Sequence, residues 1–246
     1  KAQARQVLIK TAEKNGIAWR KNYQELENSS AKDLLAGITN KNLIYPDYYQ
    51  VPFHAYDRGN MCWEAAFEAE SATHAMALRV WRDEKLTWEE AEAKLRNSFY
   101  SIVDRYSPTL VTNILDMGCS VGISTLSLHR HYEQRQQQPI RTVGLDLSPY
   151  MLSVAKIADE KQEISQWVHA LAEDTGFPEN SFDIITLQLV IHELPRYATK
   201  QIFQEALRLL RKGGILAIVD NNPASPTIQN LPPALFILMK STEPWS

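Results

Sequence analysis

The feature that most constrains this chain is a glycine turn between an apolar run and an amphipathic stretch, at residues 114–125. Asp116 lies near the end of the apolar run, and Gly118 and Gly122 lie in the turn. Thirty positions after Asp116 the pattern recurs in part, because a second apolar run contains Asp146 near its end. A glycine turn lets a ligand approach the backbone closely, and an acid at the tip of the next strand can accept hydrogen bonds from ribose hydroxyls. The two motifs together predict an α/β sheet that holds an adenosine-containing cofactor.

From residue 110 onward, the apolar residues alternate between the spacing of strands and that of helices. Strands are expected at 111–117, 141–147, 166–172, 182–190 and 215–221, and helices at 122–132, 149–160 and 199–211. Gly213 and Gly214 are expected to end the last helix, and the glutamine-rich run 134–138 to form a solvated loop. Alternating units of this kind make a doubly wound, mostly parallel sheet that binds ligands at the carboxyl ends of its strands.

Residues 1–107 are dense in helix formers and are expected to form an N-terminal helical region beside the sheet. One helical stretch is expected at 2–26, with a break at Gly16, and another at 63–81. Thr87 and Glu90 form a capping box for a further helix. The apolar stripe expected on that helix comprises Ala91, Leu95, Phe99, Ile102, Val103 and Tyr106.

An irregular segment rich in aromatic residues, at 42–57, interrupts these helices. Its two prolines break any helix there. We expect the segment to line a substrate pocket or to form a lid over the cofactor, because so much aromatic surface is unusual in an irregular stretch. The residues expected to bind the substrate are Tyr48, Tyr49, Phe53 and Trp63.

Composition excludes several classes of protein. A length of 246 residues with 44% hydrophobic content fits one α/β domain with an appendage. A net charge of −3 argues against nucleic acid as a partner. Cys62 and Cys119 make no disulfide framework, which indicates a reducing compartment, and no apolar run is long enough for a membrane span. We therefore expect a cytoplasmic protein with no metal site, because neither the cysteines nor the six histidines have zinc spacing. The oligomeric state stays open.

Four segments follow one another in an order that is typical of a known family. Residues 116–122 read acid-x-Gly-x-Ser-x-Gly, residues 172–183 follow the third strand, residues 191–195 form a histidine-containing turn after the fourth, and residues 207–216 lead into the fifth. Over residues 110–222 the chain resembles class I S-adenosylmethionine-dependent methyltransferases, especially the type that acts in ubiquinone and menaquinone biosynthesis. The resemblance implies a Rossmann-like methyltransferase fold, S-adenosylmethionine as cofactor, and methyl transfer to a small-molecule acceptor at carbon, oxygen or nitrogen.

The resemblance also implies the residues of the cofactor site. The glycine loop would cradle the methionine moiety, Asp146 would accept the ribose hydroxyls, and Leu147 and Ala172 would flank the adenine. The cofactor-binding residues expected on this basis are Asp116, Gly118, Cys119, Gly122, Asp146, Leu147, Ala172, Glu173 and Gln188.

The chain departs from the family pattern at several places, among them Leu171, where many members have an acid, and Lys212, where a proline is usual. Ser120 replaces the middle glycine of the loop, which a small residue can do if the position needs no positive φ. Residues 108–246 are expected to form the cofactor-binding core, but too few residues follow the fifth strand for the family's next helix and terminal hairpin. We expect that hairpin to be truncated or disordered.

A catalytic base is the least constrained part of the prediction. His192 follows the fourth strand directly, and its ordinary pKa near 6.5 suits a base at neutral pH. His54, in the aromatic segment, is the second candidate. The alternative for His192 is that it caps the turn before Pro195 or packs against Tyr197. Asp220 is expected to cap the turn that follows the fifth strand rather than to bind a metal.

Two other functions stay open on the sequence alone. A catalytically idle scaffold with the methyltransferase fold would predict decay of the cofactor loop, and here the loop is intact. A dinucleotide-dependent oxidoreductase also ends its second strand in an acid, but its fingerprint needs three glycines spaced Gly-x-Gly-x-x-Gly. Gly118 and Gly122 have the wrong spacing for that fingerprint.

Overall fold

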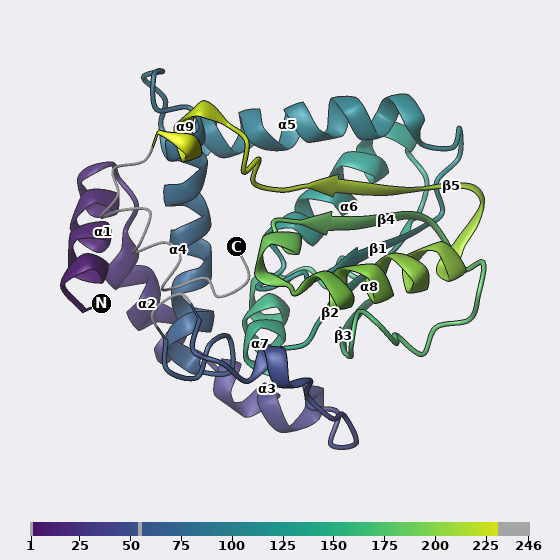
Figure 1. Ribbon diagram of the computed structural model, residues 1–246, viewed down its shortest axis with the longest axis horizontal. Coiled ribbons are helices and arrows are strands. Elements are labelled where there is room, and N and C mark those ends of the chain that lie inside the picture. The colour runs from purple at the N-terminus through teal and green to yellow at the C-terminus, as the bar shows by residue number, and fades with distance from the viewer. Residues whose placement is uncertain (1, 54–55, 231–246) are drawn as a thin grey trace.

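A five-stranded parallel sheet forms the centre of the molecule (Figure 1). The computed structural model describes residues 2–53 and 56–230. The strand order is β3-β2-β1-β4-β5, and the strands are β1 (Asn113–Met117), β2 (Arg141–Asp146), β3 (Gln166–His169), β4 (Phe182–Gln188) and β5 (Leu210–Val219). Every pairing is parallel. The predicted α/β class with a parallel sheet is confirmed.

Helices cover both faces of the sheet. Those of the second half of the chain are α6 (Ile123–Gln136), α7 (Pro149–Ala158), the short η2 (Ile191–Glu193), α8 (Arg196–Leu209) and α9 (Pro226–Gln229). Alternate residues of β1 point to opposite faces. Leu115 and Met117 pack with Ile202 of α8, whereas Ile114 packs with Leu128 of α6. The sheet is therefore doubly wound.

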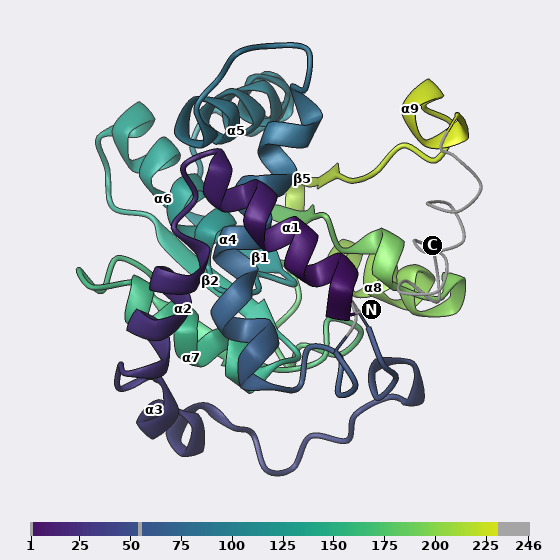
Figure 2. The same cartoon turned by 90° about the vertical axis from the view of Figure 1, so that its left-hand side faces the viewer.

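The N-terminal helices lie against the carboxyl ends of the strands. They are α1 (Ala2–Lys14), α2 (Trp19–Glu27), α3 (Ala31–Ile38), the short η1 (Asp47–Tyr49), α4 (Trp63–Val80) and α5 (Trp88–Tyr106). The arrowheads of β4 and β5 point toward α4 (Figure 1), and α1 lies on the outer side of α4 (Figure 2). In the part of the chain that the structure describes, no helix is long and apolar enough to cross a membrane.

Helix α5 differs from the other N-terminal helices. It contacts α4, but it also packs on the sheet beside α6. Its capping box is present, because the Thr87 amide donates to Glu90 Oε2 at 2.9 Å and the Glu90 amide donates to Thr87 Oγ1 at 3.3 Å. The predicted apolar stripe is wrong in part. Ile102 and Tyr106 are 50% and 64% exposed, whereas Tyr100 is buried in the core.

The structure corrects two predicted boundaries. Gly213 and Gly214 do not end a helix, because α8 ends at Leu209 and β5 begins at once. An irregularity in the β4–β5 register absorbs the residues between Leu210 and Ile215, and Gly213 has a φ of +84°. The run 134–138 is not entirely loop either, because α6 continues to Gln136.

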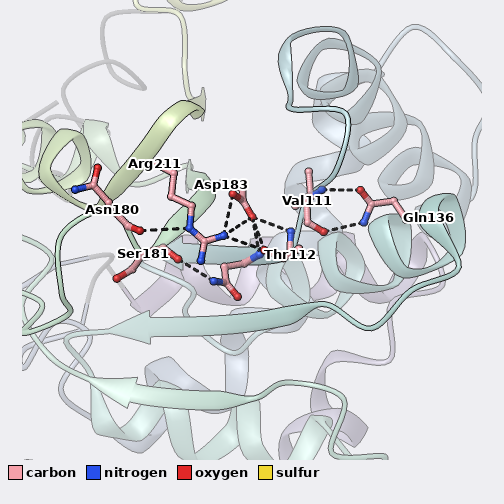
Figure 3. Close-up of polar contacts among 8 residues, drawn as sticks. Val111, Thr112, Gln136, Asn180, Ser181, Asp183 and Arg211 are labelled. Atoms are coloured by element: carbon pink, nitrogen blue, oxygen red, sulfur yellow. Dashed lines mark hydrogen bonds and ion pairs between the residues drawn. The ribbon is translucent and has the colours of Figure 1, made fainter.

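Polar contacts fix the amino ends of β1, β4 and β5, opposite the predicted site (Figure 3). Asp183 Oδ2 accepts from the amides of Thr112 and Asn113, at 2.7 and 2.9 Å. Arg211 donates to the same carboxylate at 3.1 Å and to Thr112 Oγ1 at 2.9 Å. The side chain of Gln136 exchanges two hydrogen bonds of 2.8 Å with the backbone of Val111. These contacts hold the amino ends of β1, β4 and β5 in place relative to one another.

Candidate functional site

The glycine loop lies at the carboxyl end of β1 and folds against β2. The amides of Gly118 and Cys119 both donate to the Leu145 carbonyl, at 2.8 and 3.0 Å. Gly118 and Gly122 have φ values of +74° and +83°. A Cβ atom on Gly118 would lie 2.7 Å from a methyl carbon of Val190, and one on Gly122 would lie 2.6 Å from the Trp167 ring. Both positions therefore require glycine.

Ser120 departs from its prediction. It has a φ of +50°, so the position does need a positive φ. Its amide donates to Asp146 Oδ2 at 2.8 Å, and this charge-assisted hydrogen bond compensates for the strained backbone. This hydrogen bond thus joins the glycine loop after β1 to the acid at the end of β2.

Asp116 is fully buried, and its carboxylate is occupied by hydroxyl groups of the protein. Oδ2 accepts from Ser124 at 2.6 Å and from Thr125 at 2.8 Å, and Oδ1 accepts from Thr186 at 2.6 Å. The side chain therefore ties β1 to α6 and β4. A direct role for Asp116 in cofactor binding stays a prediction.

Asp146 lies at the tip of β2 and is 8% exposed. Besides Ser120, its carboxylate accepts from the amide of Ser148 at 2.8 Å. Burial raises the pKa of Asp146 to about 6, although the hydrogen bonds from these two amides oppose the shift. A carboxylate has about four lone-pair positions. The hydrogen bonds from Ser120 and Ser148 leave part of this capacity, so the carboxylate can accept a further donor such as a ribose hydroxyl.

The neighbouring predicted residues lie at the same edge of the sheet. Leu147 follows Asp146 directly and is 9% exposed. Because β3 ends at His169, Ala172 and Glu173 lie in the loop after it rather than in the strand. Cys119 is 2% exposed, and burial raises the pKa of its thiol, so its side chain faces the interior.

Residues 40–53 and 56–60, which we call the roof segment, are bound to this edge. The amide of Asn40 donates to His169 Nδ1 at 2.8 Å, and the Tyr45 hydroxyl lies 3.0 Å from His169 Nε2. The Tyr48 hydroxyl donates to Glu173 at 2.5 Å. Burial, and after it the charge of Asp146, raises the pKa of the Tyr49 hydroxyl.

The other two predicted substrate residues, Phe53 and Trp63, pack within the N-terminal region, and the second candidate base is not described. Phe53 is buried and pairs with Tyr56 through its backbone. Trp63 stacks on Phe67 of α4 and meets Tyr150 of α7 edge-on, with ring centroids 5.3 and 4.9 Å apart. His54 lies outside the described residues.

His192 is paired with an acid from the neighbouring strand. Its Nδ1 lies 2.6 Å from Asp220 Oδ1, just beyond β5. Asp220 Oδ2 also accepts from the amides of Ile191 and His192, at 2.6 and 3.3 Å. Burial acts to raise the pKa of Asp220, but the hydrogen bond and charge of His192, together with hydrogen bonds from the backbone, outweigh burial and lower it. Asp220 therefore holds η2 in addition to its own turn, where it accepts from Asn221.

Gln188, at the end of β4, meets a residue that the sequence did not indicate. Its Oε1 accepts from Arg96 Nη1 of α5 at 2.9 Å. The 92 positions between the two residues explain why the sequence hides the contact. The one sequence pattern that could have pointed to Arg96 is the spacing of Glu92, Arg96 and Tyr100. This spacing places three polar groups on one face of the helix.

Comparison with known families gives the class of the sheet domain. Residues 115–218 match the model of the family described as a methyltransferase domain. The resemblance seen in the four motifs is confirmed.

Relatives share this domain rather than the whole chain. An uncharacterized methyltransferase of Synechocystis is 33% identical over 130 residues, which cover 53% of this chain and 57% of that protein. A demethylmenaquinone methyltransferase of Oceanobacillus iheyensis is 29% identical over 132 residues, covering 53% and 52%. The chain thus spans about half the length of these relatives. Among solved structures, the PH0226 protein of Pyrococcus horikoshii is similar, with 19% identity, a TM-score of 0.45, and coverage of 52% of this chain and 57% of that one.

Proposed function

We propose that this chain transfers a methyl group from S-adenosylmethionine to a small-molecule acceptor. The observation that carries the proposal is the contact between Ser120 and Asp146. It holds the glycine loop and the acid of β2 side by side at the carboxyl edge of the sheet, with lone pairs of the acid left for further donors. A nucleoside with an amino-acid tail needs both elements at once.

Each part of the cofactor has a proposed partner. The loop at 118–122 cradles the methionine moiety, because its glycines leave room for close approach. Asp146 accepts the ribose hydroxyls. Leu147 and Ala172 flank the adenine, and Glu173, which accepts from Tyr48, fixes the roof segment beside it.

The methyl acceptor binds between the roof segment and the ends of β4 and β5 in this proposal. Methyl transfer needs donor and acceptor atoms aligned about 3 Å apart and shielded from water. Tyr49 lies on the roof side of this space and His192 on the strand side. The hydrogen bond to Asp220 fixes the tautomer of the neutral imidazole in which Nδ1 is the donor, so Nε2 takes the acceptor's proton.

The similarity to demethylmenaquinone methyltransferases makes demethylmenaquinone the first acceptor to test. The protein would be incubated with S-adenosylmethionine labelled in its methyl group, together with demethylmenaquinone or a small-molecule extract. We expect label in one small product. His192→Gln should lower turnover by about 10²-fold and leave cofactor affinity nearly unchanged. Cofactor binding without label transfer to any acceptor would favour the idle scaffold instead.

A further inference from the structure

Arg96 of α5 is a largely buried cation whose donors are only partly used. Its side chain is 14% exposed. Nη1 donates to Gln188 Oε1 at 2.9 Å, and Nη2 lies 3.5 Å from Glu92 Oε1. Arg96 Nε and Gln188 Nε2 are buried and have no hydrogen-bond partner among the residues that the structure describes. Two adjacent donors without an acceptor are unusual in a folded protein and point to a ligand oxygen.

The acid next to Arg96 is shared with a second cation. That acid, Glu92, lies closer to His74, with 2.5 Å between Oε2 and His74 Nδ1. Burial acts to lower the pKa of His74, but the hydrogen bonds that its imidazole donates to Glu70 and Glu92 prevail and raise it to about 9, so His74 is a cation at neutral pH. Glu92 is therefore shared by two cations. Glu70, the second acid of the group, lies 3.7 Å from His74 Nε2, and the contact that Arg96 makes with an acid is the longer one with Glu92. A ligand anion next to Arg96 would give this buried cation a closer partner.

The position of Arg96 beside the glycine loop follows from its neighbours. Tyr100, one helical turn along α5, donates to Ser127 of α6 at 2.7 Å, so this face of α5 meets the helix that starts at the loop. Met117 pairs with Leu187 in the sheet, which puts Gln188 next to Gly118. Figure 1 shows α5 running beside α6 along the sheet.

We propose that Arg96 and Gln188 bind the carboxylate of the methionine moiety of S-adenosylmethionine. This inference rests on the proposed function. The carboxylate is the only anionic group of that cofactor, and the ribose is assigned to Asp146 at the next strand, which leaves the methionine end for Arg96. A guanidinium matches a carboxylate in geometry as well as in charge.

The test compares S-adenosylhomocysteine with its decarboxylated analogue by calorimetry on the full chain. The wild type should prefer S-adenosylhomocysteine by about tenfold to a hundredfold, the usual effect of hydrogen bonds to a charged group. Arg96→Met should remove this preference by weakening S-adenosylhomocysteine alone. Arg96→Lys keeps the charge and should retain part of the preference. Arg105→Met, on an exposed position of the same helix, is the matched control and should behave as wild type.

The outcomes separate this inference from the proposed function. Equal affinity of the wild type for the two ligands would overturn the role of Arg96 while leaving cofactor binding intact. A preference for S-adenosylhomocysteine that survives in Arg96→Met would also overturn that role. If that variant then had a raised KM for the methyl acceptor, Arg96 would be assigned to the acceptor instead. A wild type that binds neither ligand contradicts the proposed function itself. Because the comparison of ligands on the wild type needs no mutant, misfolding of a variant does not affect it.

Discussion

At the scale of single residues, Asp146 joins the fold to the proposed chemistry. Its carboxylate holds the strained Ser120 and the start of α7, and it is also the group proposed to accept the ribose. Burial raises the pKa of Asp146 to about 6. The ionised form is thus present at neutral pH and is lost on mild acidification.

Cofactor affinity should therefore depend on pH. Hydroxyl donors need the ionised carboxylate, so lowering the pH from 7 to 5 should weaken S-adenosylhomocysteine binding by up to about tenfold. Asp146→Asn, which has similar shape and does not titrate, should bind more weakly at neutral pH and show a flat profile. Calorimetry across this range checks both statements. An unchanged slope in Asp146→Asn would assign the titration to another group.

At the scale of elements, Asp183 connects the amino ends of three strands. It accepts from two backbone amides of the chain entering β1 and pairs with Arg211 of β5. Burial acts to raise its pKa, but the hydrogen bonds from Thr112 and Asn113 prevail and lower it. A depressed pKa stabilises the fold above the unfolded value near 4, and this contribution is lost as the pH falls through the folded value.

Asp183→Asn should lower the free energy of unfolding by about 1–3 kcal/mol at neutral pH, because an amide cannot accept all of these hydrogen bonds or pair with Arg211. The difference from wild type should shrink as the pH falls below about 4. Denaturant titrations at several pH values measure it. Asp83→Asn, at a position where the side chain is 92% exposed, is the control and should change little. A difference that stays constant with pH would contradict the account of Asp183.

Local patterns in the sequence predict the elements better than their contacts. The glycine turn and the following acid could be located because backbone geometry demands glycine at Gly118 and Gly122. The early start of β5 could not, because it depends on pairing between Leu210 and Phe182. The positive φ of Ser120 likewise depends on a partner 26 positions away. The pairing of His192 with Asp220 joins residues that follow two different strands, β4 and β5. No periodicity in the sequence predicts this contact.

At the scale of the whole molecule, the N-terminal region and the sheet meet at the proposed site. The roof segment is attached to His169, to Glu173 and to Ser148, whose hydroxyl donates to the Asn60 carbonyl at 2.7 Å. The segment also contacts Glu193 through Asn60, and Tyr197 through Tyr48. All these contacts come from separate groups rather than from a ladder of backbone hydrogen bonds. A segment attached in this way opens locally more easily than a helix or strand.

Ligand binding should therefore slow amide exchange in the roof segment. In the free protein, we expect amide exchange in the roof segment to be faster than in α4. Once S-adenosylhomocysteine is bound, exchange in the roof segment should become slower than in the free protein, because the ligand adds contacts to it. Hydrogen exchange with mass spectrometry provides the measurement. Helix α1 serves as an internal control and should not change. Equal exchange of the roof segment in the free and bound protein would contradict a contact with the ligand and would leave the segment a purely structural role.

The central claim is that the carboxyl edge of this sheet binds S-adenosylmethionine. The most direct test is titration of the full chain with S-adenosylhomocysteine in a calorimeter, with NAD titrated in parallel. We predict saturable binding of one S-adenosylhomocysteine per chain and no binding of NAD. Preference for NAD, or binding of neither compound, would contradict the claim.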